Sequence, residues 1–157
     1  MIIRTISGLL GGVIVVIVLM FNGTMPFLLN CAVATVCALA CYEFFSVMNL
    51  HKTAIAVVPS LIFSALLPVL GSGLVWQGAW LGYSFFMFGV VLLLASELNF
   101  KDIAAIYSMV LLITVSLNFI VKLMDFGGEF GSFYVLYALC ISWMADIGAY
   151  FWGTFFG

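Results

Sequence analysis

Long apolar runs alternate with short polar stretches along the whole chain. Each run covers about 20 residues, and a helix of that length spans the ~30 Å hydrocarbon core of a bilayer. The short stretches between the runs hold most of the charged side chains. The pattern predicts an all-α, polytopic integral membrane protein with about six transmembrane helices, at residues 1–23, 25–48, 53–70, 76–96, 103–124 and 133–157.

The composition agrees with this pattern. Of the 157 residues, 67% are hydrophobic and 6% are charged, whereas ordinary soluble domains carry roughly 25% charged residues. A soluble globule of this size could not cover its surface with so few charges. No domain boundary is visible, so residues 1–157 are predicted to form a single transmembrane helical region. The chain has no basic patch or run, and nucleic acid is therefore not expected as a partner.

Basic residues favour one orientation in the membrane. With a cytoplasmic N-terminus, Arg4, Lys52 and Lys101 lie on the cytoplasmic side, and only Lys122 lies on the other. Positive charge collects in the cytoplasmic loops of membrane proteins. We therefore expect a multi-pass protein of the cell's inner membrane with its N-terminus inside. The end of the last helix then points toward the cytoplasm.

Three smaller features give further expectations. The four cysteines lie inside apolar runs without zinc-ligand spacing, and we expect them to be small buried hydrophobic residues. Trp76, Trp80 and Tyr83 open the fourth apolar run, as residues of an interfacial aromatic belt do. Residues 125–132, which read DFGGEFGS, are expected to form a glycine-rich acidic loop.

The last apolar run contains an acid, Asp146. Residues four apart stack on one face of a helix, so Asp146 shares a polar row with Ser142, Tyr150 and Thr154. A charge at membrane depth costs about 3 kcal/mol or more, which makes an intramembrane acid a functional candidate. The alternative is structural. Small residues four apart are typical of tightly packed membrane helices, and an Asp near a helix end can reach the headgroups.

The last twelve residues, DIGAYFWGTFFG, resemble the D-x-G-A-Y-x-x-G-x-x-x-G segment of the phosphatidate cytidylyltransferases, the CDP-diacylglycerol synthases. Arg4 before an apolar first helix, and Tyr42-Glu43-Phe44 near the end of the second, are also similar to that family. The resemblance implies a nucleotidyltransferase of phospholipid biosynthesis. Such an enzyme converts CTP and phosphatidate into CDP-diacylglycerol and pyrophosphate within the bilayer, with Mg²⁺ as its cofactor.

The resemblance also implies roles for four residues of this sequence. Asp146 would be the catalytic residue and a metal ligand, directly or through a water. Gly148 and Gly153 would let a phosphate or a backbone approach closely, and Tyr150 would donate a hydrogen bond to substrate or anchor the interface. Thr154 departs from the family, which usually places a basic residue there, and this weakens any phosphate contact at that position.

Members of the family continue beyond the point that corresponds to Gly157. Their later helices carry a lysine-rich segment and a C-terminal signature with aspartates, which would supply most metal and nucleotide ligands. We therefore expect this sequence to be the N-terminal portion of such an enzyme. We also expect the 157-residue chain to turn over no substrate by itself.

Two other functions stay open on the sequence. One is a small transporter or channel subunit, because intramembrane acids mark ion paths, although the sequence offers neither a paired basic residue nor a repeat of broken helices. The other is a non-catalytic membrane scaffold that uses the rows of small residues as an oligomer face, and a homo-oligomer is also open for the enzyme. A lysine-rich loop and an aspartate-bearing helix in the coding sequence after Gly157 would favour the enzyme.

Overall fold

The computed structural model describes residues 2–23, 25, 27–70, 73–94 and 99–156. For residues 2–10, 51 and 52 it describes the backbone alone, so the side chains of Arg4 and Lys52 lie outside the described part. Within this part, the regular secondary structure is entirely helical, as predicted. The elements are α1 (Ile2–Asn22), α2 (Phe27–Val47), η1 (Leu50–Thr53), α3 (Ala54–Leu66), α4 (Leu74–Leu94), α5 (Phe100–Gly127), η2 (Gly128–Phe130) and α6 (Gly131–Phe156).

Three segments of the described chain are long and apolar enough to cross a membrane: Phe27–Val47, Leu74–Leu94 and Phe100–Phe156. The last of these contains α5, η2 and α6. Helix α3 has 13 residues, about 20 Å at the helical rise, which is less than the ~30 Å hydrocarbon core. The protein is therefore a membrane protein, while the six crossings and the cytoplasmic N-terminus stay predictions.

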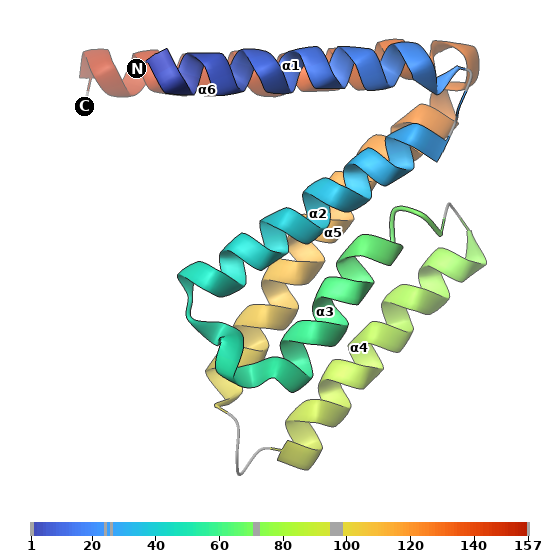
Figure 1. Ribbon diagram of the computed structural model, residues 1–157, viewed down its shortest axis with the longest axis vertical. Helices are drawn as coiled ribbons and strands as arrows, with labels where there is room; N and C mark the ends of the chain where they lie inside the picture. Colours follow the sequence, from blue (N-terminus) through green and yellow to red (C-terminus); the bar gives the residue numbers. More distant parts are fainter. Residues whose placement is uncertain (1, 24, 26, 71–72, 95–98, 157) are drawn as a thin grey trace. The chain divides into compact units, whose positions relative to one another are not determined.

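The chain divides into two compact units, Met1–Val121 and Lys122–Gly157. In the first unit, α3 lies between α2 and α4, as Figure 1 shows, and the short η1 packs on both α2 and α3. Helix α1 packs against α2. Asn49 has φ 54° in the turn before η1, a left-handed conformation that Asn tolerates better than most residues.

The core of the first unit is built from the facing sides of α2, α3, α4 and α5. The buried residues of α5 recur every three or four positions, which places them on one helix face: Ile103, Ile106, Val110, Thr114, Asn118 and Val121. Phe45 of α2, Met87 of α4 and Ile106 of α5 are almost completely buried in the same apolar cluster. Close packing of these side chains holds the helices together, since the surrounding lipid is as apolar as the side chains.

Tyr83 differs from the prediction. It is 6% exposed, and its ring stacks on that of Phe63 with centroids 4.1 Å apart. The residue lies nine positions after the start of α4 and on the side that packs against α3, so the core and not the interface surrounds it.

The prediction that all four cysteines are buried holds for two of them. Cys37 and Cys41 are buried as predicted, whereas Cys31 and Cys140 are exposed.

The corner between α5 and α6 also differs from the prediction. Most of the expected loop at residues 125–132 is helical, because α5 continues to Gly127 and α6 begins at Gly131. Gly128 has φ +51°, and a methyl group at Gly131 would clash with the backbone oxygen of Met124. The glycines are therefore needed for a tight helical corner and not for a long loop.

We expect Gly131→Ala to destabilise this corner. The added methyl meets the backbone oxygen of Met124, which cannot rotate away as a side chain can, and overpacking of this kind costs about 2 kcal/mol. Thermal unfolding in lipid-containing micelles measures the loss. Gly148→Ala is the matched control, because a methyl there meets no atom within 4 Å. Equal stability of the two variants would contradict the close approach at Gly131.

Candidate functional site

All four predicted site residues lie on α6, which is one continuous helix from Gly131 to Phe156. At ~100° per residue, Asp146, Tyr150 and Gly153 fall within about 60° of one another around the helix axis. Gly148 lies about 200° from Asp146 by the same geometry. The helix therefore brings three of the four residues to one face and puts Gly148 on the other side.

Side-chain contacts on α6 separate a polar row from an aromatic one. The Thr154 hydroxyl donates a hydrogen bond to the Tyr150 carbonyl oxygen at 2.8 Å, so this donor is already used by the backbone and is not offered to a phosphate. Elsewhere on the helix, the rings of Phe151 and Phe155 stack with centroids 6.3 Å apart. The stacked rings suit hydrocarbon, while the row that contains Asp146 suits a polar ligand.

Both sides of α6 are open within its own unit, the face that carries Asp146 and the side that carries Gly148. Asp146, Gly148, Tyr150 and Gly153 are all exposed, and a methyl group at either glycine would meet no atom within 4 Å. Residues 122–156 thus supply one wall of a candidate site and leave room beside it. Close approach by a substrate at Gly153 is sterically allowed.

A metal ion at Asp146 would find few protein ligands nearby. Among the residues that the structure describes, no group of three His, Cys, Asp or Glu side chains is placed to hold a metal ion. Magnesium typically takes one or two carboxylates and completes its shell with waters and substrate phosphates. A single carboxylate on α6 fits that pattern only when a phosphate-bearing substrate is also bound.

The first unit contains a buried polar cluster that the sequence reasoning missed. The Tyr83 hydroxyl lies 2.8 Å from Ser60 Oγ, which in turn donates to the Ala56 carbonyl oxygen at 2.6 Å. The Cys41 thiol contacts the hydroxyls of Ser64 and Thr114. These groups join α2, α3, α4 and α5 inside the apolar core.

Asn118 lies one turn beyond Thr114 on the buried face of α5. It is 1% exposed, and neither its carboxamide oxygen nor its nitrogen has a hydrogen-bond partner among the described residues. Buried amides in proteins are usually satisfied by protein groups or by ordered water. The signal in the sequence was the spacing: two pairs of polar residues, each four apart, interrupt α3 and α5 at Ser60, Ser64, Thr114 and Asn118.

Comparison with known families identifies the class. Residues 2–157 match the family model described as the cytidylyltransferase family. The match covers almost the whole chain, and the protein therefore belongs to the cytidylyltransferase family, as the last twelve residues indicated. No curated protein and no solved structure matches the chain.

Family membership and the apolar helices together define a membrane protein of nucleotidyltransferase type. They imply a nucleotide substrate and a lipid environment.

Proposed function

We propose that this protein acts in the transfer of CMP from CTP to phosphatidate, which forms CDP-diacylglycerol for phospholipid biosynthesis. The observation that carries the proposal is the polar row around Asp146 on an apolar helix, within a chain of the cytidylyltransferase family. A water-soluble nucleotide and a lipid must meet in this reaction. A carboxylate in a membrane helix is a suitable site for both substrates to bind.

The reaction needs no strong base from the protein. A phosphate oxygen of phosphatidate is already anionic near neutral pH, and it attacks the α-phosphorus of CTP. The new P–O bond forms as the bond from the α-phosphorus to the bridging oxygen breaks, and pyrophosphate leaves with that electron pair. Catalysis of such transfers depends mainly on positioning and on stabilisation of negative charge.

Asp146 cannot assist two anionic substrates by direct contact, because like charges repel. We therefore propose that Asp146 acts through Mg²⁺, as one protein ligand beside waters and substrate phosphates. When bound, the ion would screen the phosphates and polarise the α-phosphoryl group. Tyr150, on the same face, is proposed to donate a hydrogen bond to a substrate or to anchor the helix at the interface.

The proposed location is the cell's inner membrane, with six crossings and the N-terminus in the cytoplasm. In this topology the C-terminal end of α6 faces the cytoplasm, and Asp146 lies about 15 Å along the helix from Phe156. CTP would arrive from the cytoplasm, and phosphatidate would arrive laterally from the bilayer. The two substrates then approach the same face of α6 from different directions.

Gly153 is proposed to admit a substrate phosphate beside Asp146, and Gly148 to admit a close approach from its own side of α6. We expect Gly153→Ala to lower kcat/KM about tenfold, the effect of losing about 1.4 kcal/mol of transition-state stabilisation. The fold should not suffer, because alanine is the better helix former and its methyl meets nothing within 4 Å. Gly78→Ala on α4, also in open space, is the control. Full activity of Gly153→Ala would remove this residue from the site.

A substrate panel tests the proposed function. The complete gene product in phospholipid vesicles is given CTP, UTP, ATP or GTP, together with phosphatidate or with phosphatidylglycerol, and pyrophosphate release is followed. We expect release that requires both CTP and phosphatidate, and no release from the 157-residue chain alone. Turnover with a different lipid acceptor would keep the nucleotidyl transfer and overturn the choice of phosphatidate.

A further inference from the structure

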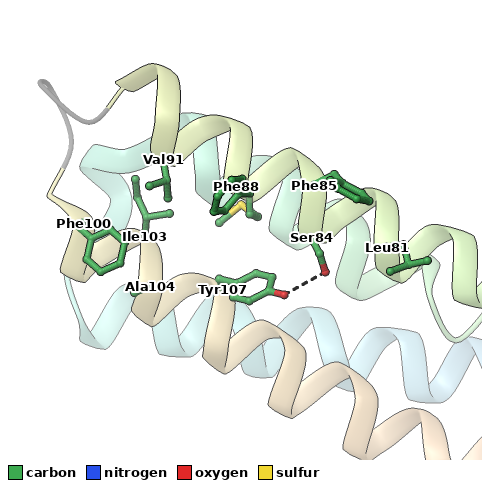
Figure 2. Close-up of a pocket in the computed structure, with 10 residues that line it drawn as sticks. Leu81, Ser84, Phe85, Phe88, Val91, Phe100, Ile103, Ala104 and Tyr107 are labelled. Atoms are coloured by element: carbon green, nitrogen blue, oxygen red, sulfur yellow. Dashed lines mark hydrogen bonds between the residues drawn. The ribbon is translucent and has the colours of Figure 1, made fainter.

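A cavity of about 450 Å³ lies between α4 and α5 in the unit Met1–Val121. Its volume is within the range of ~300–1,000 Å³ that is typical of small-ligand sites. Figure 2 shows the two helices on either side and large apolar side chains along the walls, including Phe85, Phe88, Val91, Phe100 and Ile103. This cavity and the neighbouring one, which is lined by Trp76, Gln77 and Trp80, are together called the α4–α5 groove.

The polar groups in this cavity satisfy each other. The Tyr107 hydroxyl donates to Ser84 Oγ at 3.0 Å, the dashed line in Figure 2, and the Ser84 hydroxyl donates to the Trp80 carbonyl oxygen at 2.9 Å. None of the described residues that line the cavity is charged. A nucleotide or a headgroup would lose its bonds to water there without replacement, whereas a hydrocarbon chain would lose none.

The cavity continues toward the start of α4. A second cavity of about 640 Å³, lined by Trp76, Gln77 and Trp80, shares Leu81 with the first. From Trp76 to Val91 the groove follows about 22 Å of α4 at the helical rise, which is longer than the ~15 Å depth of one leaflet's hydrocarbon. Tryptophan at a helix start marks the membrane–water interface, so the Trp76 end of the groove lies at one of the two interfaces.

We propose that the α4–α5 groove holds one acyl chain of a phospholipid from the surrounding bilayer. The headgroup lies at the end marked by Trp76 and Gln77, and the tail passes the satisfied Ser84–Tyr107 pair to end between Phe88 and Phe100. Among the described residues, the groove offers no charged side chain that would select a headgroup. The occupant is therefore bulk phospholipid, held for its tail, and not the phosphatidate of the proposed reaction.

Photocrosslinking in vesicles tests the proposal. The complete protein is placed in phosphatidylcholine vesicles that contain a trace of phosphatidylcholine with a diazirine near the end of one tail. After irradiation, labelled residues are mapped by mass spectrometry. We expect strong labelling of Ile103 and Ala104 in the groove and weaker labelling around Leu93, which is 83% exposed on α4 and does not line the groove.

Two variants fill the groove from opposite helices, Ala104→Phe from α5 and Val91→Trp from α4. Each should reduce groove labelling to the level found around Leu93, and Leu93→Phe should leave it unchanged. Circular dichroism verifies that the variants are folded. Because the two substitutions lie on different helices, the result does not depend on a local effect of one of them. Groove labelling that equals labelling around Leu93, or that persists in both filled variants, would overturn the proposal. Stronger labelling of the groove by a diazirine phosphatidate than by the diazirine phosphatidylcholine would also overturn it.

Discussion

Asp146→Asn is expected to abolish CTP-dependent turnover by the complete enzyme, with a loss of about 100-fold or more in kcat. Losing one preorganised charge interaction in a transition state typically costs 10²–10³-fold. The substitution keeps the shape of the side chain and removes the charge that would hold Mg²⁺. Asp146 is exposed within its own unit, so little packing there depends on it.

The control for this variant is Asp125→Asn. Asp125 is an exposed acid of the same unit, located in the last turn of α5 and outside the proposed site. It should retain wild-type kcat and the same dependence on Mg²⁺ concentration. Wild-type activity and magnesium dependence in Asp146→Asn would rule out the proposed role of this carboxylate.

Tyr83→Ala is expected to have the largest effect on stability, a loss of about 3 kcal/mol or more. The Tyr83 ring stacks on Phe63 with an interplanar angle of 7°, and it also lies 5.9 Å from the ring of Tyr107. Truncation leaves a void between α3, α4 and α5 that rigid helices cannot close. Reversible unfolding in bicelles, followed by tryptophan fluorescence, measures the loss.

Tyr83→Phe separates the ring from the hydroxyl. Ser60 Oγ donates to Ala56, so the Tyr83 hydroxyl is the donor in its 2.8 Å bond to Ser60. Removing that donor leaves Ser60 with its own donor still satisfied, and the cost is about 0.6 kcal/mol, the average for such bonds in membrane proteins. If Phe and Ala cost the same, the hydroxyl and not the ring packing would hold α3 against α4.

Length and hydropathy predicted the helices well where each apolar run was flanked by polar residues. The predicted run at 25–48 became α2, and the run at 76–96 became α4, each within a few residues. The run at 53–70 was too long because Pro68 follows α3 closely and has no backbone N–H to continue the helical hydrogen bonds, although Leu67 before it still has helical angles. The glycines at 127, 128 and 131 suggested a loop, but tertiary contacts between Met124 and Gly131 make a tight corner there.

The family and its motif were visible in the last twelve residues, while the arrangement around them was not. Spacing alone placed Asp146 and Tyr150 on one face of α6. It could not show that Tyr83 turns into the core, because both the interface and a buried face accept tyrosine. Spacing also put Thr114 and Asn118 on one face of α5, but it could not show that this face packs into the interior.

The position of the radiolabel after turnover tests the central claim most directly. The complete enzyme is incubated with phosphatidate and with CTP labelled in either the α- or the γ-phosphate, and lipid is then extracted. The account predicts that α-label enters the lipid, that γ-label appears only in pyrophosphate, and that Asp146→Asn prevents both. Transfer of γ-label to lipid would make the protein a kinase, and the absence of any labelled lipid would contradict nucleotidyl transfer.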